Sequence, residues 1–244
     1  MKRKTKYIPS LLIPYSVFFV LLGIPLSKSL KNNQNSLLVV SMLIAIVLLI
    51  LLFITFAWLI KKNDLLEFNG IKNGIKFINP KLLLIPLIYF IYIIIRDFNI
   101  YSNLKILELI LLAMSSLLIG LAEEFFFRGI LFPYFISFFK RKKYSLFFSV
   151  LLSSIVFGLF HYLNLFQSSV SFIEITLQVV YAFFTGILFC ALLLRTKSII
   201  IPSLIHALID FRGLTYVLYR NKTTIIPKSL DKKLPDGIFW EILI

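Results

Sequence analysis

The 244-residue chain contains one cysteine, Cys190, and two histidines, and charged residues make up only 15% of it. A single cysteine excludes an intrachain disulfide and a cysteine-based metal cage. Acidic residues are scarce, with 11 Asp and Glu against 26 Lys and Arg, whereas 59% of the residues are hydrophobic. Soluble domains carry about 25% charged and about 45–50% apolar residues. The composition therefore excludes a soluble domain and indicates a chain that folds in lipid.

The formal net charge of +15 raises the question of nucleic-acid binding. Such binding needs basic residues gathered on one face of a soluble module. Here the basic residues lie between apolar runs, which is typical of cytoplasmic loops and of contact with anionic lipid headgroups. The expected partner is therefore the lipid bilayer, and nucleic acid is excluded.

Apolar windows between polar breaks predict the membrane spans, because a helix needs about 20 apolar residues to cross the hydrocarbon layer. The windows are residues 8–26, 37–60, 82–95, 104–139, 146–166, 172–194 and 199–219. The predicted fold class is all-α, a multi-spanning transmembrane helix bundle with seven or eight spans. An eighth crossing or a re-entrant segment would lie after residue 212.

The distribution of Lys and Arg predicts the orientation. If the basic N-terminus is cytoplasmic, the linker 61–81 and the run 140–143 are cytoplasmic as well. Window 8–26 resembles a signal peptide, but no A-x-A cleavage site follows it, so we expect a retained first span. The Lys-, Ile- and Asn-rich composition favours a multi-pass protein of a bacterial cytoplasmic membrane.

Three parts of the chain are expected. Residues 1–103 hold the N-terminal spans and a linker, residues 104–211 form the core of the bundle, and residues 212–244 form the tail, with one possible further span or re-entrant segment. Window 104–139 would be about 54 Å long as one helix, against a hydrocarbon core of about 30 Å. Gly120, Gly129 and Pro133 are predicted as places where this helix bends.

A few ionisable residues interrupt the apolar windows. If left unpaired at the bilayer centre, Glu123, Glu124, Arg128 and Asp210 would together cost about 10 kcal/mol. Glu124 and Arg128 are four residues apart and are expected to form an ion pair on one helical face. Glu123 is rotated from Glu124 by about 100° and has no such local partner.

Both histidines also lie in apolar windows. His206 shares a helical face with Asp210, four residues later, and His161 comes from another predicted helix. A single intramembrane histidine is more often a helix–helix contact, and a Glu–Arg pair can be purely structural. The compatible depths of Glu123, His161 and His206 nevertheless favour one functional cluster, because intramembrane ionisable residues usually mark functional sites.

Three motifs combine these residues: EExxxRG from Glu123 to Gly129, FxxxH from Phe157 to His161, and HxxxD from His206 to Asp210. In this order they resemble the CPBP family of intramembrane proteases, which includes the CAAX prenyl endopeptidases and the bacteriocin-processing or immunity (Abi) proteins. The resemblance implies a membrane-embedded peptidase that acts on a peptide or protein substrate.

The resemblance also implies roles for individual residues. Glu123 would activate water, Glu124 would pair with Arg128, and the catalytic site would be completed by His161, His206 and Asp210. Phe157 opens the second motif and supports the site. The third motif of the family usually ends in Asn, and an ionised Asp210 cannot donate a hydrogen bond to an oxyanion as an amide can.

Two mechanisms are open. In one, Glu123 is a general base and the histidines stabilise the oxyanion. In the other, a divalent ion such as zinc is held by residues from the set Glu123, His161, His206 and Asp210, and Asp210 favours this version because it adds a negative charge. Non-catalytic alternatives are a membrane scaffold or bacteriocin immunity protein and, with less support, a proton-coupled transporter, for which repeated halves are missing.

Overall fold

The computed structural model describes residues 80–166 and 171–223, together with isolated positions between residues 15 and 70. The predicted spans 8–26 and 37–60 and the tail beyond Thr223 lie largely outside the described residues. The described elements from Pro80 onward are all helical, without a strand among them. The predicted all-α class is confirmed for this part of the chain.

The helices follow one another with short connections. In chain order they are η3 (Pro80–Leu83), α3 (Leu84–Arg96), α4 (Phe98–Ser102), α5 (Ile106–Phe126), η4 (Phe127–Leu131), α6 (Phe132–Phe139), α7 (Ser145–Phe160), η5 (His161–Phe166), α8 (Phe172–Thr196) and α9 (Ile200–Thr223).

Four helical segments of the described chain are long and apolar enough to cross a membrane. They are Ile106–Phe139, Ser145–Phe166, Phe172–Thr196 and Ile200–Lys222. These agree with the last four predicted windows, whereas the total of seven or eight spans is not confirmed. Residues 212–223, the first part of the predicted tail, continue α9 without a break.

The longest segment contains a π-helical turn. α5, η4 and α6 run on from one another, and η4 is the π-helical turn Phe127–Leu131, which includes Gly129. The Phe132 N–H donates to the Phe127 carbonyl five residues earlier. The Ser153 hydroxyl of α7 donates to the same carbonyl at 3.4 Å. π turns of this kind often occur at functional sites.

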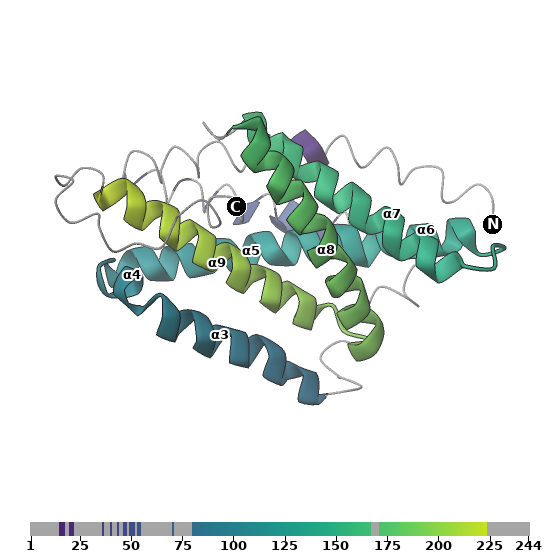
Figure 1. The fold of residues 1–244 in the computed structure, drawn as a ribbon, viewed down its shortest axis with the longest axis horizontal. Helices are drawn as coiled ribbons and strands as arrows, with labels where there is room; N and C mark the ends of the chain where they lie inside the picture. The colour runs from purple at the N-terminus through teal and green to yellow at the C-terminus, as the bar shows by residue number, and fades with distance from the viewer. Residues whose placement is uncertain are drawn as a thin grey trace.

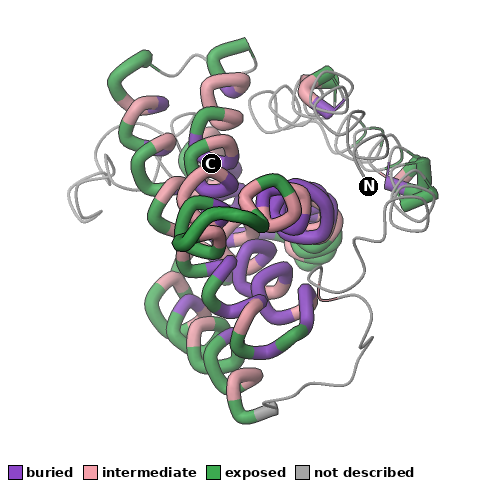
Figure 2. The backbone as a smooth tube through the Cα atoms, turned by 90° about the vertical axis from the view of Figure 1, so that its right-hand side faces the viewer, coloured by how far each residue is buried: buried purple, intermediate pink, exposed green. Residues whose placement is uncertain are grey.

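The helices pack in two main pairs. α9 lies along α5, α7 lies along α8, and α3 covers another side of α9 (Figure 1). Buried residues line the inner sides of these helices, and their outer sides are exposed (Figure 2). The exposed residues include many large apolar side chains, as expected for helix faces that contact lipid.

Small residues permit the close approach within these pairs. A Cβ added at Gly120 of α5 would lie 2.8 Å from the Ala207 N of α9 and 3.0 Å from the Ser203 carbonyl oxygen. Gly120 is therefore a contact point between two helices, a role that the sequence did not predict. Small residues are the usual means by which membrane helices approach each other, since lipid provides no hydrophobic driving force.

Ion pairs hold α9 at its C-terminal half. Arg212 Nε donates to Asp97 Oδ2 at 2.5 Å, next to the start of α4. Lys222 Nζ lies 2.6 Å from both carboxylate oxygens of Glu108, in the first turn of α5. Glu108 also accepts a hydrogen bond from the Lys105 N–H at 2.9 Å. These contacts fix the axial position of α9 against its neighbours.

We expect Gly120→Ala to lower the stability of the protein by about 1–3 kcal/mol, because the added methyl group would press on the backbone of α9. Thermal unfolding in detergent measures the change. Leu117→Ala, at a partly exposed position of the same helix, is the control and should cost less. Equal unfolding temperatures for Gly120→Ala and the unmodified protein would contradict the close contact.

Candidate active site

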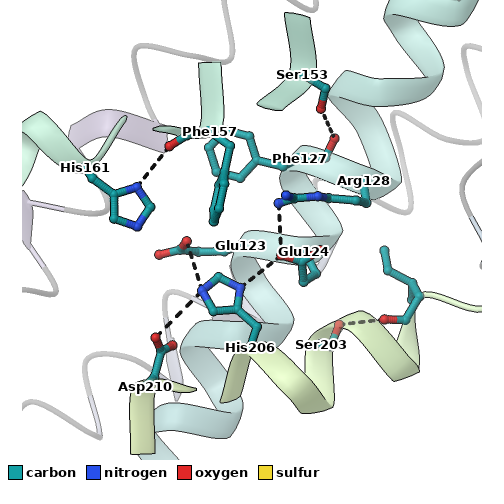
Figure 3. Close-up of polar contacts among 11 residues, drawn as sticks. Glu123, Glu124, Phe127, Arg128, Ser153, Phe157, His161, Ser203, His206 and Asp210 are labelled. Carbon is teal, nitrogen blue, oxygen red and sulfur yellow. Dashed lines mark hydrogen bonds and ion pairs between the residues drawn. The ribbon is translucent and has the colours of Figure 1, made fainter. Parts of the chain in front are cut away.

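The site is assembled from three helical segments. α5 and the π turn supply Glu123, Glu124 and Arg128, η5 supplies His161 directly after the end of α7, and α9 supplies His206 and Asp210. These side chains meet within the bundle, and Phe157 lies among them (Figure 3). The predicted convergence of the three motifs is therefore present in the structure.

Glu124 and Arg128 form the predicted ion pair. Arg128 Nη1 donates to Glu124 Oε1 at 2.9 Å, and both side chains are 0% exposed. The guanidinium also lies over the Phe157 ring, 4.2 Å from its centroid, and 5.3 Å from the centroid of Phe189. Cation–π contacts are stronger in such a desolvated place than at a surface. The positive charge of Arg128 is thus held in place from several sides.

Glu124 has a second partner, which its spacing from Arg128 does not reveal. His206 Nδ1 lies 2.9 Å from the same oxygen, Glu124 Oε1. A carboxylate paired with an arginine is ionised and only accepts hydrogen bonds. His206 Nδ1 therefore carries the proton, and the pair with Glu124 fixes both the tautomer and the orientation of the ring.

The other nitrogen of His206 is directed toward two further carboxylates. His206 Nε2 lies 3.7 Å from Glu123 Oε2 and 3.7 Å from Asp210 Oδ1. At this separation the contacts are close ion-pair geometries rather than short hydrogen bonds. His206 is thus the centre of the cluster, with a carboxylate from α5 on each nitrogen and Asp210 from its own helix beside Nε2.

His161 approaches from the opposite side. Its Nδ1 lies 3.0 Å from the Phe157 carbonyl oxygen, to which it donates. Its Nε2 is thereby left for other partners, and the ring faces the Glu123 carboxylate (Figure 3). The Phe157 ring meets His161 edge-on, with 5.0 Å between the centroids. Phe157 thus orients His161 and packs on Arg128 at once.

The charges in the cluster do not balance. Three carboxylates, those of Glu123, Glu124 and Asp210, face one guanidinium and the imidazole of His206. Because the guanidinium is always charged, even a protonated His206 leaves one negative charge in excess. The cluster can therefore take up a further proton, as general base catalysis requires.

The carboxylates and histidines of the cluster are also the residue types that bind metal ions. Within the described part of the chain, His, Cys, Asp and Glu residues do not form a group of three or more that could hold a metal. Glu123 and Asp210 are placed around His206 at ion-pair distances instead. In this arrangement the residues therefore do not fit a zinc site.

α8 contributes residues to the site although it carries none of the three motifs. A Cβ added at Gly186 would lie 3.1 Å from Arg128 Nη2 and 3.1 Å from the Ser154 Cβ. Gly186 therefore leaves the space that the guanidinium occupies. The Phe189 ring lies 5.3 Å from His206, centroid to centroid. Neither residue could be assigned from the sequence, because glycine and phenylalanine are common in apolar helices.

These features define a class: a multi-pass α-helical membrane protein with a buried cluster of carboxylates and histidines. Residues 105–212 match the Rce1-like family model, described as type II CAAX prenyl endopeptidase Rce1-like. This segment of the chain is similar to that family, in agreement with the resemblance to the CPBP intramembrane proteases. The match covers less than half of the 244 residues. No curated protein and no solved structure matched the chain.

The two adjacent glutamates should respond differently to the same substitution. Glu124→Gln removes the charge opposite the buried Arg128 and should destabilise the protein by about 3–5 kcal/mol. Glu123→Gln removes only the longer contact to His206 and should cost about 1 kcal/mol at most. Chemical unfolding in detergent measures both free energies. Equal losses for the two variants would contradict the division of roles between them.

Proposed function

We propose that the protein is an intramembrane endopeptidase that uses Glu123 to activate water against a peptide bond. The similarity of residues 105–212 to a family of prenyl endopeptidases supports a peptidase. The observation that carries the assignment to Glu123 is its place in the cluster: it is buried, and its carboxylate lies between the rings of His161 and His206 (Figure 3).

Glu123 is the carboxylate best suited to proton transfer. Glu124 is bound to Arg128 and to His206 Nδ1 at 2.9 Å each, so accepting a proton would cost it both charge-assisted contacts. Asp210 lies one helical turn from His206 on α9 and is further from His161 (Figure 3). Glu123 alone faces both rings, in a position where a water molecule would contact a base and a histidine together.

The proposed reaction is hydrolysis. Glu123 takes a proton from water while the water oxygen forms a bond to the carbonyl carbon of the substrate, and the carbonyl oxygen becomes an oxyanion. The C–N bond then breaks, and the proton held by Glu123 passes to the leaving nitrogen. The products are a carboxylate and an amine. General base catalysis of this kind contributes about 10²–10⁴-fold.

The two histidines have different proposed roles. His161 Nε2, with Nδ1 held by the Phe157 carbonyl, orients the attacking water beside Glu123. His206, protonated on Nε2 as well as Nδ1, stabilises the oxyanion, and Asp210 stabilises that positive charge from 3.7 Å. With this assignment Asp210 acts through His206 and does not have to donate a hydrogen bond itself.

The location of the site restricts the substrate. The cluster lies in helices that can span a membrane, so a peptide must enter the bilayer region to reach it. We therefore propose a membrane-proximal or lipidated peptide as the substrate, presented from the lipid phase. The cytoplasmic N-terminus remains a prediction from the Lys and Arg pattern. The bacterial cytoplasmic membrane remains a prediction from the Lys-, Ile- and Asn-rich composition.

We expect Glu123→Gln to reduce peptide cleavage by about 10²–10⁴-fold, because an amide cannot accept the proton of the attacking water. His161→Ala should reduce cleavage as well. A peptide-library cleavage assay with detergent-purified or reconstituted protein measures both effects.

Glu174→Gln is the matched control for this assay, since Glu174 caps the start of α8 by accepting the Ser171 N–H at 2.7 Å and lies outside the cluster. It should cleave at the normal rate. Cleavage by Glu123→Gln at the normal rate would contradict the assignment. A cellular phenotype that survives this substitution would support a scaffold or immunity role.

Metal dependence separates the two mechanisms that the sequence leaves open. For the metal-free reaction, protein treated with a chelator and then dialysed should keep its cleavage rate, and elemental analysis should find far less than one zinc per chain. Loss of cleavage on chelation, with recovery on adding zinc, would instead support a metal bound by Glu123, His161, His206 or Asp210.

A further inference from the structure

Two buried amide side chains form a pair close to His161. Asn164 belongs to η5 and Gln178 to α8, and Asn164 Nδ2 donates to Gln178 Oε1 at 3.0 Å. Asn164 is 8% exposed and Gln178 is 3% exposed, and both lie in segments that can span a membrane. A buried amide in such a place is costly without a hydrogen-bond partner. The pair is therefore a defined polar contact between two segments, and none of the three motifs includes either residue.

η5 places Asn164 on the same face as His161. This element is a 3₁₀ helix that begins at His161 and ends at Phe166. A 3₁₀ helix has three residues per turn, so residues that are three apart lie on one face. Asn164 follows His161 by three residues. The contact with Gln178 therefore holds the turn that carries His161, one turn beyond the histidine.

A second contact joins α7 to α8 just before His161. A Cβ added at Gly158 would lie 2.8 Å from the Val179 carbonyl oxygen of α8 and 3.3 Å from the Phe183 Cβ. Val179 directly follows Gln178 in the sequence. His161 thus lies between two contacts with the same part of α8. One is a close approach of backbones, and the other is the amide pair.

The amide pair restrains His161 in a way that its own hydrogen bond does not. His161 Nδ1 donates to the Phe157 carbonyl at 3.0 Å, which orients the ring relative to the end of its own helix. α8 also packs on the rest of the cluster, because its Phe189 ring lies 5.3 Å from that of His206. The bond from Asn164 to α8 therefore relates the position of His161 to the position of His206.

We propose that Asn164 and Gln178 are positioning residues for His161: their hydrogen bond ties the turn that carries His161 to α8 and so holds its ring beside Glu123. This inference rests on the proposed function, in which His161 orients the attacking water. Neither amide touches the reacting atoms. Amide pairs between membrane helices can also serve only to hold the helices together. The two roles differ in one respect: the effect of a positioning residue depends on the presence of His161.

The first experiment compares steady-state cleavage by Gln178→Leu and by the unmodified protein in the same lipid vesicles. Leucine keeps a side chain of similar size in the helix and removes the hydrogen-bond acceptor. We expect kcat to fall about 10- to 100-fold with KM nearly unchanged, because a small displacement of a catalytic group has an effect of this size. A normal kcat, or a rise in KM alone, would overturn the positioning role.

A rescue variant and a control accompany this substitution. Exchanging the two amides, Asn164→Gln with Gln178→Asn, keeps the combined length of the pair and should recover most of the lost rate. A rate as low as that of Gln178→Leu would count against the hydrogen bond. Thr185→Val is the matched control, since the Thr185 hydroxyl donates to the Tyr181 carbonyl of its own helix at 2.8 Å. It should leave kcat unchanged.

The His161→Ala background separates positioning from stability. If the pair acts through His161, adding Gln178→Leu to His161→Ala should lower the residual rate by less than about twofold, because substitutions that act through one group are not additive. A further fall as large as that caused by Gln178→Leu alone would show that the pair acts independently of His161 and would overturn the inference.

The outcomes also distinguish this inference from the proposed function. If Glu123→Gln and His161→Ala lose cleavage while Gln178→Leu cleaves at the normal rate, the positioning role is overturned and the proposed function stands. If Glu123→Gln cleaves normally, or if no peptide is cleaved, the proposed function fails and the inference fails with it.

A second experiment tests the contact without using activity, and it applies even if Gln178→Leu does not fold. Replacing Cys190, the one cysteine of the chain, by Ala leaves a background for cysteine pairs. A short bifunctional thiol reagent should bridge Asn164→Cys and Gln178→Cys, but not Asn164→Cys and Leu188→Cys, at an exposed position further along α8. Failure to bridge the first pair, or equal bridging of both, would overturn the contact.

Discussion

The Glu124 carboxylate binds a guanidinium and an imidazole that come from different parts of the chain. Its Oε1 accepts from Arg128 on the adjoining π turn and from His206 on α9, at 2.9 Å in each case. Without Arg128, a second buried carboxylate next to Glu123 would be strongly unfavourable. Without Glu124, His206 would lose the contact that sets its tautomer. The shared oxygen thus orients His206, whose Nε2 lies 3.7 Å from both Glu123 and Asp210.

The supporting structure brings these two partners to Glu124. The π turn that contains Arg128 is stabilised by the Ser153 hydroxyl of α7, and Gly186 of α8 leaves space for the guanidinium. α9 is held against α5 by the close contact at Gly120 and by ion pairs toward both ends of its C-terminal half. These contacts are made by small residues or by polar groups. This is expected in a membrane, where burial of apolar surface does not drive helix association.

The three acidic residues of the cluster have different surroundings and, in the proposed reaction, different roles. Glu124 is paired with Arg128, Asp210 lies beside His206, and Glu123 is the acid that exchanges a proton in the proposed reaction. A site built in this way can be charged and still lie within a membrane, because the ionisable groups lie next to one another inside the bundle. The segment that matches the prenyl endopeptidases contains this whole cluster.

The sequence by itself determined the helical class, the last four spans and the residues of the cluster. These follow from local rules: apolar run length predicts spans, and four-residue spacing predicts the pairs Glu124–Arg128 and His206–Asp210. Only the tertiary structure decided that Glu124 also binds His206, that Gly120 is a helix contact, that Gly186 adjoins the site, and that Asn164 pairs with Gln178. Those facts depend on how helices far apart in the chain face one another, and in an apolar helix no residue pattern records which side meets which neighbour.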